Sequence, residues 1–371
     1  MPVSPALAED LAAAVADLYE AAESVLVERV RRALAEGIDS PDWINRKLSA
    51  LGDLQAGVQA IIDALEADAS GAVRQAVAEA YARGQQVAVA ELGALAAGQA
   101  AAASVSLPVA PAVDRLAAAL VEETGGVHLR VLRQTMDVYR EAIARAAAAP
   151  LLGAQSRRQA ARTALKAFAR SGVRGFVDRR GRSWELRSYV EMATRSVVGR
   201  AAVEAHTDRL DAAGVDLVVV SRSPEECPLC RPWEGKVLTR TGPGGRRTVE
   251  LEHATDDGEF VTVRVAGSLP EARSAGLLHP NCRHNISAYL PGVTRLPASV
   301  PARATYEQSQ QQRYLERQVR RWKREAAAAL DEQEAKAARV RIRAYQARIR
   351  ALVEETGLPR KSHREQLTAA R

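Results

Sequence analysis

The feature that most constrains this chain is a helical periodicity built from small apolar residues. Apolar positions recur at alternating four- and three-residue steps in the first helical stretch, as in Leu11, Val15, Leu18, Ala22 and Val25. Such steps place apolar side chains on one face of a helix. Aromatic residues make up only 4% of the 371 residues, whereas alanine is abundant. The pattern therefore predicts closely packed helices rather than a core of large aromatic side chains.

Strand patterns appear in the second half of the chain. The stretch "FVDRRGRSW", residues 176–184, has apolar residues on both sides of a short polar turn and indicates a small hairpin. The runs "VDLVVVS", "GKVLT" and "EFVTVRVAG" indicate three more strands, with "TGPGGRRT" as a turn before the last of them. A small β-containing region is therefore expected after residue 214.

The end of the chain returns to a helical pattern. Leu315, Val319 and Trp322 begin an apolar stripe, which lapses across "DEQEAKAAR" and resumes out of register at Ile342. A single helix of about fifty residues would extend roughly 75 Å. A helix of that length usually needs a partner, so a coiled-coil-like contact or an arm across another subunit is expected.

Composition narrows the class of protein. The first residues lack a basic segment and carry Glu9 and Asp10, which argues against a secretory signal. The uncharged run from Leu92 to Val113 contains glycines, prolines and mostly alanine, so we interpret it as a helix end and a linker in a soluble protein without membrane association. Three cysteines cannot all pair within one chain, which favours a reducing compartment with free thiols.

Charge is segregated along the chain. Residues 1–156 hold 12 basic and 20 acidic residues, 157–187 hold 10 and 2, 188–302 hold 13 and 14, and 303–371 hold 17 and 9. Two basic blocks suggest contacts with nucleic acid or an acidic protein surface, although a solvated helix face is the alternative. The candidate contact residues in the last block are Arg317, Arg320, Arg321, Lys323 and Arg324.

The three cysteines lie in two short motifs that also contain histidine. Cys227 and Cys230 form a C-x2-C pair, and His279 and Cys282 form an H-x2-C pair with His284 two residues further on. Two tight pairs of thiol and imidazole ligands are typical of a structural Zn²⁺ site. We predict that Cys227, Cys230, His279 and Cys282 bind zinc, with His284 as an alternate ligand or an outer partner. Buried apolar cysteines are the alternative.

Catalytic interpretations of these motifs fit less well. Zinc deaminases require H-x-E upstream of P-C-x-x-C, but the sequence before Cys227 offers only "EAH", in the wrong order. An HNH-like metal-dependent nuclease acting on DNA is closer, because "HPNCRHN" holds His279, Asn281 and His284. These three residues are too close together to span the required hairpin and helix. The chain is therefore expected not to be an enzyme.

These patterns combine into a prediction of the whole fold. We expect an α+β, mostly α protein with a helical N-terminal half, a small zinc-stapled β-containing domain and a long C-terminal helix. The expected regions are helices over 1–103, a linker over 104–112, helices over 113–213 with a hairpin near 176–184, a β-rich metal-stapled domain over 214–297, a long basic helix over 303–356 and a tail over 357–371.

Three segments carry a family resemblance. "GFVDRRGRSWELRSYVEMATRS", "DLVVVSRSPEECPLCRPWEGKVL" and "LLHPNCRHNISAYLPG", in that order, resemble the phage minor capsid protein 2 family of tailed bacteriophages. They are also distantly similar to Mu gpF-like head morphogenesis proteins, in which C-x2-C is often followed by "HPNCR". The resemblance covers roughly residues 172–292 and departs from the Mu-like pattern at His284, where many relatives have a further cysteine. It implies scaffold roles for Gly175, Asp178, Trp184, Tyr189 and Glu191.

The resemblance also implies a function. It indicates a structural virion component that is made in the bacterial host cytoplasm and built into the head, at the head interior or the portal vertex. Its expected partners are portal or capsid proteins, and packaged DNA through the basic segments. Several copies per virion are expected, and zinc is the expected cofactor, in a structural role.

Overall fold

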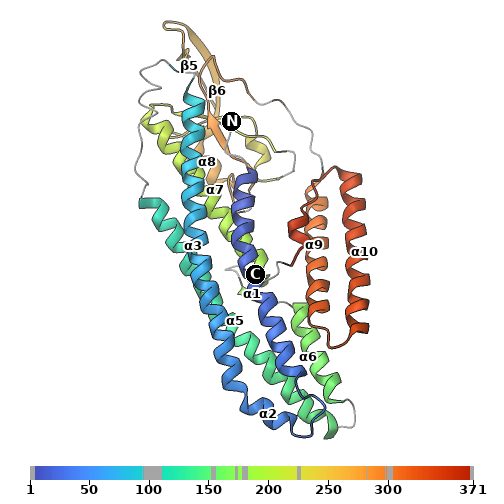
Figure 1. Ribbon diagram of the computed structural model, residues 1–371. Coiled ribbons are helices and arrows are strands. Elements are labelled where there is room, and N and C mark those ends of the chain that lie inside the picture. Colours follow the sequence, from blue (N-terminus) through green and yellow to red (C-terminus); the bar gives the residue numbers. More distant parts are fainter. Residues whose placement is uncertain are drawn as a thin grey trace. The chain divides into compact units, whose positions relative to one another are not determined.

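The computed structural model describes residues 5–93, 95, 111–151, 156–171, 174–177, 183–223, 227–280, 282–296, 298 and 304–367 (Figure 1). Most of the linker expected over 104–112 lies outside these residues, as do Asp178 and Asn281. The described chain is mostly helical with a small mixed sheet, which confirms the predicted fold class. It forms two compact units: unit 1 comprises Met1–Ala13, Ala72–Leu120 and Glu191–Tyr306, and unit 2 comprises Ala14–Gly71, Val121–Val190 and Glu307–Arg371.

Long amphipathic helices dominate, as the periodicity predicts. Several of them contribute residues to both units, because the unit boundaries fall inside the helices. None of the helices in the described ranges is long and apolar enough to cross a membrane. The helices before the sheet are α1 (Pro5–Ala35), α2 (Trp43–Ser49), α3 (Leu51–Leu92), α5 (Pro111–Leu151), α6 (Arg157–Ser171) and α7 (Leu186–Ala212).

Unit 1 contains a five-stranded sheet in the order β5-β6-β4-β3-β7. Only the β4–β6 pair is parallel, and the other neighbours are antiparallel. The strands β3, β4 and β6 correspond to the three predicted runs, whereas β5 and β7 were not predicted. The elements are β3 (Leu217–Val220), η1 (Arg231–Trp233), β4 (Val237–Thr239), β5 (Arg247–Glu252), β6 (Phe260–Ser268), α8 (Leu269–Ser274) and β7 (Ile286–Ala288).

The core of unit 1 lies between this sheet and three helices. Leu92 of α3, Leu210 of α7 and Leu269 of α8 pack with Val218 and Ile286 from the two neighbouring strands β3 and β7. Cys230 belongs to the same cluster and is fully buried. The loops that carry the cysteines are therefore anchored directly on the core of unit 1.

Unit 2 is a helical assembly with a short hairpin. β1 (Arg174–Val177) and β2 (Ser183–Glu185) pair antiparallel, which is the hairpin that the sequence indicates. Trp43 is fully buried and donates its indole N–H to the Leu34 carbonyl at 3.1 Å. Tyr19 of α1 stacks on His128 of α5 with ring centroids 5.7 Å apart, so these aromatic residues lie where helices pack together.

The prediction of one long helix over 303–356 is wrong. The structure has two helices, α9 (Tyr306–Ala327) and α10 (Glu332–Thr356), which lie side by side as a helical hairpin (Figure 1). Asp331 caps α10 by accepting a hydrogen bond from the Glu334 N–H at 2.9 Å, and this cap sits where the apolar stripe loses its register. The partner expected for a long C-terminal helix is therefore a second helix of the same chain.

The residues after α10 pack back against α9. Gly357 ends α10 in the left-handed conformation, with φ 68°. The Pro359 carbonyl then accepts a hydrogen bond from Gln312 at 2.9 Å, and the Arg364 carbonyl accepts one from Arg320 at 2.8 Å. The segment expected as a tail is thus part of the unit 2 fold as far as residue 367, and includes η2 (Ser362–Glu365).

Candidate metal centre

A strand ladder brings the two cysteine motifs together. β3 and β7 pair antiparallel, with Val220 opposite Ile286, so the chain leaves β3 at the same end of the sheet where it enters β7. Ser221 N–H extends the ladder by donating to the Asn285 carbonyl at 2.9 Å. The C-x2-C motif follows β3 and the H-x2-C motif precedes β7. Register alone therefore positions both motifs at one edge of unit 1.

The first motif is a tight turn. The Cys227 carbonyl accepts hydrogen bonds from the Cys230 N–H at 3.1 Å and the Arg231 N–H at 2.9 Å. The chain then passes into η1, whose second position is Pro232. This turn directs both thiols of the motif toward the same side.

The second motif follows an abrupt end of α8. The Leu277 N–H bonds back to the Ala272 carbonyl at 2.8 Å, and Leu278 has φ 59°, a region that costs a non-glycine residue about 1 kcal/mol. Such a conformation persists where the surrounding packing holds it, and Leu278 packs against the core cluster of unit 1. The Cys282 N–H then bonds to the His279 carbonyl at 2.8 Å, closing a second tight turn.

The five candidate ligands converge as two overlapping groups of three that share Cys230. One group holds Cys227, Cys230 and His279, the other holds Cys230, Cys282 and His284, and within each group the donor atoms lie within 4.8 Å of one another. Cys227 Sγ is 3.0 Å from His279 Nε2, and Cys230 Sγ is 3.4 Å from Cys282 Sγ. The structure thus joins residues that are separated by about fifty positions in the chain.

Each imidazole is oriented by an acceptor on its outer nitrogen. His279 Nδ1 lies 2.6 Å from the Pro280 carbonyl, and His284 Nε2 lies 2.5 Å from Glu234 Oε1. Because these oxygens accept, the outer nitrogens carry protons, and the inner nitrogens face the thiols, where each could bind a metal once it is deprotonated. This is the arrangement found around metal-bound histidines. Glu234 was missed in the sequence, although it lies only four residues after Cys230.

The electrostatics of the site favour one thiolate in particular. Hydrogen bonding from Cys230 and His284 lowers the pKa of Cys282 below its usual range despite its burial. The same Cys230–Cys282 hydrogen bond, together with burial, raises the pKa of Cys230. Burial by itself lowers the pKa of His284, but its hydrogen bonds to Cys282 and Glu234 outweigh burial and the net direction is upward.

The donor set fits a soft divalent metal. Three thiols and two imidazoles are ligands that suit Zn²⁺, whereas Mg²⁺ and Ca²⁺ prefer oxygen. Cys282 Sγ also accepts a hydrogen bond from the His284 backbone N–H at 3.3 Å. His284 therefore stabilises the sulfur through its backbone even if its ring does not bind the metal. A metal bound here would join the β3–β4 connection to the segment before β7. The geometry gives no support to an HNH-like nuclease, because both histidines lie in one short loop and face thiols.

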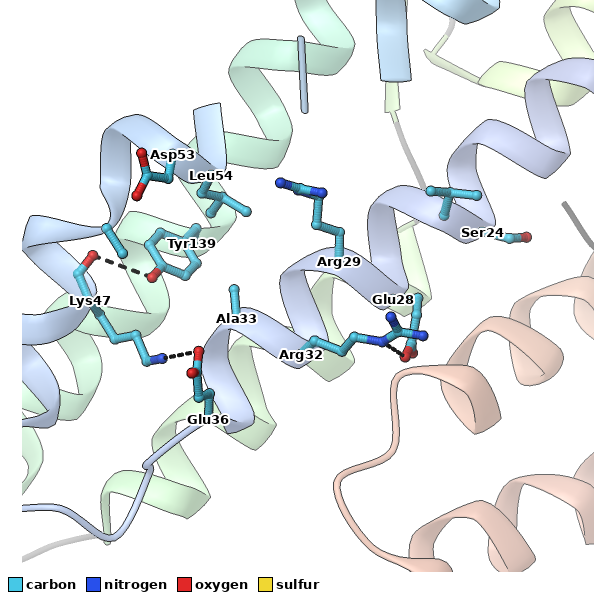
Figure 2. A pocket seen from close by; sticks show the side chains of 12 residues that line it. Ser24, Glu28, Arg29, Arg32, Ala33, Glu36, Lys47, Asp53, Leu54 and Tyr139 are labelled. Atoms are coloured by element: carbon cyan, nitrogen blue, oxygen red, sulfur yellow. Dashed lines mark hydrogen bonds and ion pairs between the residues drawn. The ribbon is translucent and has the colours of Figure 1, made fainter. Parts of the chain in front are cut away.

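A separate cleft in unit 2 offers less chemistry. It has a volume of about 830 Å³ and its lining contains neither cysteine nor histidine. Figure 2 shows how its polar groups pair: Lys47 contacts Glu36 at 3.5 Å, and Arg32 contacts Glu28 at 2.5 Å. Tyr139 donates to the Lys47 carbonyl at 3.3 Å. Three cations face three carboxylates, so the cleft shows no charge preference for a ligand.

The predicted basic contact residues of α9 divide into two groups. Arg320 and Arg324 are 3% and 4% exposed and bind Glu185 at 3.1 and 2.5 Å, so they are not available to an external ligand. Arg324 also lies 3.5 Å from Glu23. Arg317 is exposed, while Arg321 and Lys323 are half-buried. The burial of Arg320 and Arg324 argues against these two of the five predicted contacts, because a helix can bury arginines where another element supplies carboxylates. For Arg317, Arg321 and Lys323 the prediction stays untested.

The residues expected as scaffold lie in both units. In unit 2, Gly175 belongs to β1, Trp184 is half-buried in β2 and the Tyr189 hydroxyl lies 2.5 Å from Glu123 Oε1. In unit 1, Glu191 pairs with Arg195 at 3.7 Å.

The structure therefore combines long helices, a small mixed sheet and a cluster of thiol and imidazole groups that could hold a metal ion. The chain belongs to the phage minor capsid protein 2 family, whose model matches residues 3–354. It is 26% identical over 250 residues to "Structural protein" of Lactococcus phage LL-H, an alignment covering 64% of this chain and 63% of that protein. No solved structure matches the chain.

Proposed function

We propose that this protein is a structural component of a phage virion, a minor capsid protein that is built into the head during assembly. The observation that carries the proposal is the family match over residues 3–354, which spans both units and the cysteine–histidine cluster. The relative in the Lactococcus phage is named as a structural protein, which supports the same role.

Virion composition tests this proposal. Purified phage particles, freed of host debris by density gradient and protease treatment, should contain the protein in several copies, measured by quantitative mass spectrometry. A host cytoplasmic enzyme of similar abundance is the control for carry-over. Loss of the protein from protease-treated particles would contradict a position inside the head.

We further propose contact with the portal or the capsid shell. Cross-linking of intact heads followed by mass spectrometry should return peptides of this chain joined to one of those two proteins. Cross-links only to tail proteins would overturn this part of the proposal and leave virion incorporation intact.

Zinc is proposed as the element that closes unit 1. Cys227, Cys230, His279 and Cys282 would hold the ion as a closed, four-ligand structural site, with His284 fixed by Glu234 behind Cys282. Bound zinc would supply a covalent-like cross-link between two loops and no open position for substrate. The three thiols should resist a thiol-reactive dye until a chelator is added; immediate reaction without chelator would contradict the proposal.

The absence of catalysis belongs to the same proposal. Clean protein should leave plasmid DNA intact in the presence of Mg²⁺. Cleavage that disappears in the His279→Ala variant would support the nuclease alternative instead.

A further inference from the structure

The middle of α10 carries a dense run of positive charge. Residues 335–353 contain six cationic side chains and no acidic residue, over about 28 Å of helix. All six are exposed. They are Lys336, Arg339, Arg341, Arg343, Arg348 and Arg350.

The inner face of α10 is already occupied. Ile349 and Leu352 pack with Leu315 and Val319 of α9, and Tyr345 contacts the same cluster. The orientation of α10 is therefore fixed by its partner helix. The cations cannot rotate inward without breaking this cluster.

Four of the cations form one outward stripe, which we call the α10 basic stripe: Lys336, Arg339, Arg343 and Arg350. Their positions are three, four and seven residues apart, which keeps them on the same side of a helix and spans about 21 Å. Arg339 pairs with the exposed Glu332 at the start of the helix. Within the part of the chain that the structure describes, Lys336, Arg343 and Arg350 have no ion-pair partner.

Two further cations flank the stripe in defined positions. The guanidinium of Arg341 lies 5.8 Å from the centre of the Trp322 ring, and that of Arg348 lies 5.5 Å from the centre of the Tyr345 ring. Cation–π contacts of this kind order an arginine without neutralising its charge. Both remain exposed and add to the positive potential beside the stripe.

We propose that the α10 basic stripe binds the phosphate backbone of double-stranded DNA without reading its sequence. DNA presents one negative charge per roughly 1.7 Å of axis, so a 21 Å stripe faces more phosphates than it has cations. A protein partner would favour buried aromatic or large apolar anchors in the middle of the surface. The middle of this face offers only Val340 and Ala347 between the cations. Its chemistry therefore matches a polyelectrolyte better than a folded acidic protein.

The identity of this DNA as the packaged genome rests on the proposed function, whereas the binding itself does not. The stripe also takes the place of Arg320 and Arg324 as nucleic-acid contacts, since both are buried in ion pairs. α9 packs against the inner face of α10, and the outer face of α10 carries the exposed cations.

The test measures the salt dependence of binding to a fluorescent 30-base-pair duplex by anisotropy, using the full chain. Each phosphate contact adds about 0.9 to the slope of log affinity against log salt. The variant Lys336→Gln/Arg339→Gln/Arg343→Gln/Arg350→Gln should reduce that slope by about 3 to 4. Circular dichroism and thermal unfolding should match the wild type, because the four side chains are exposed.

A matched control removes the same charge elsewhere. Arg74→Gln/Arg83→Gln/Arg115→Gln/Arg133→Gln neutralises four exposed arginines of α3 and α5 and leaves the stripe intact. This variant should keep the wild-type slope to within about one unit.

Two results would overturn the proposal. Equal losses in the stripe variant and the control would mean that net charge alone drives binding. Unchanged DNA binding in the stripe variant, with loss of binding to a poly-glutamate probe, would assign the stripe to an acidic protein instead. Either result leaves virion incorporation, and so the proposed function, untouched.

Discussion

The two units hold buried polar centres of opposite character. In unit 2, the carboxylate of Glu185 is matched by the guanidinium groups of Arg320 and Arg324. In unit 1, Cys227, Cys230, His279, Cys282 and His284 are all electron-pair donors that face one another. In the first centre, the negative carboxylate is neutralised by arginines of the same chain. In the second centre, every side chain can donate an electron pair, which is the chemistry of a site that binds a cation. Buried polar groups in this fold are therefore used in two ways: the carboxylate in unit 2 is balanced by arginines, and the donors in unit 1 suit zinc.

Metal removal should have the largest effect and should be confined to unit 1. A four-ligand structural zinc contributes on the order of 10 kcal/mol to folding. After chelation, hydrogen exchange should accelerate in β3, β7 and the two cysteine turns, measured by mass spectrometry. Exchange in α9 should stay unchanged, because the Glu185 centre needs no metal. Equal acceleration in both regions would remove the distinction between the two centres.

Arg324→Ala should have the next largest effect and should act on unit 2. The substitution leaves Glu185 and Glu23 buried without this counter-charge, a change that costs about 3–5 kcal/mol. Denaturant unfolding followed by circular dichroism measures the loss. Arg343→Ala is the matched control on α10 and should change the unfolding free energy by no more than about 0.5 kcal/mol. A similar cost for both variants would contradict the assignment of Arg324 as structural.

The pH dependence of unit 2 should separate two neighbouring carboxylates. Burial raises the pKa of Glu20 to about 7 although Arg187 and Arg320 oppose the shift, so its contribution is full below about 4.5 and is lost as the pH rises to 7. For Glu185, Arg324 and Arg320 outweigh burial and hold the pKa well below its usual range, so its contribution is present above about 4.5 and is lost at lower pH.

The variants Glu20→Gln and Glu185→Gln should therefore behave oppositely. Relative to wild type, Glu20→Gln should gain on the order of 3 kcal/mol between pH 4.5 and 8, because a shift of one pKa unit corresponds to about 1.4 kcal/mol. Glu185→Gln should be less stable than the wild type by a constant amount above about pH 4.5, and this deficit should shrink as the pH falls below that value. Unfolding free energies at several pH values measure both. Parallel curves for the two variants would show that the arginines do not distinguish the two acids.

Asp331→Ala should have the smallest effect. Asp331 caps α10 and also pairs with Arg162 of α6, and loss of a cap costs about 1 kcal/mol. Gln333→Ala, at an exposed position two residues further on, is the control and should be neutral. Thermal unfolding of the two variants checks the difference, and an unchanged Asp331→Ala variant would show that the hairpin turn does not depend on this cap.

The sequence predicted features that depend on local pattern and missed those that depend on distant partners. Three strands of the sheet were visible, but β7 has only three residues and β5 follows directly on a turn that masked its alternation. The convergence of Cys230 and Cys282 could be inferred from ligand chemistry, whereas the contact of Glu234 with His284 requires the fold. Arg320 looked like a surface charge because its partner, Glu185, lies 135 residues away.

The break between α9 and α10 shows the same limit. "DEQE" contains a good N-cap residue, Asp331. Within a long helical pattern, however, such a polar stretch is indistinguishable from the exposed face of a continuous helix, and only the packing of α9 on α10 shows the break.

The metal content of the purified protein decides whether zinc closes unit 1. Elemental analysis should find about one zinc per chain in the wild type and in His284→Ala, and none in Cys227→Ser or Cys282→Ser, if the ion is held by Cys227, Cys230, His279 and Cys282. Wild-type protein that binds no zinc, even after refolding with excess metal, would contradict the account and leave the cysteines as packing residues of the unit 1 core.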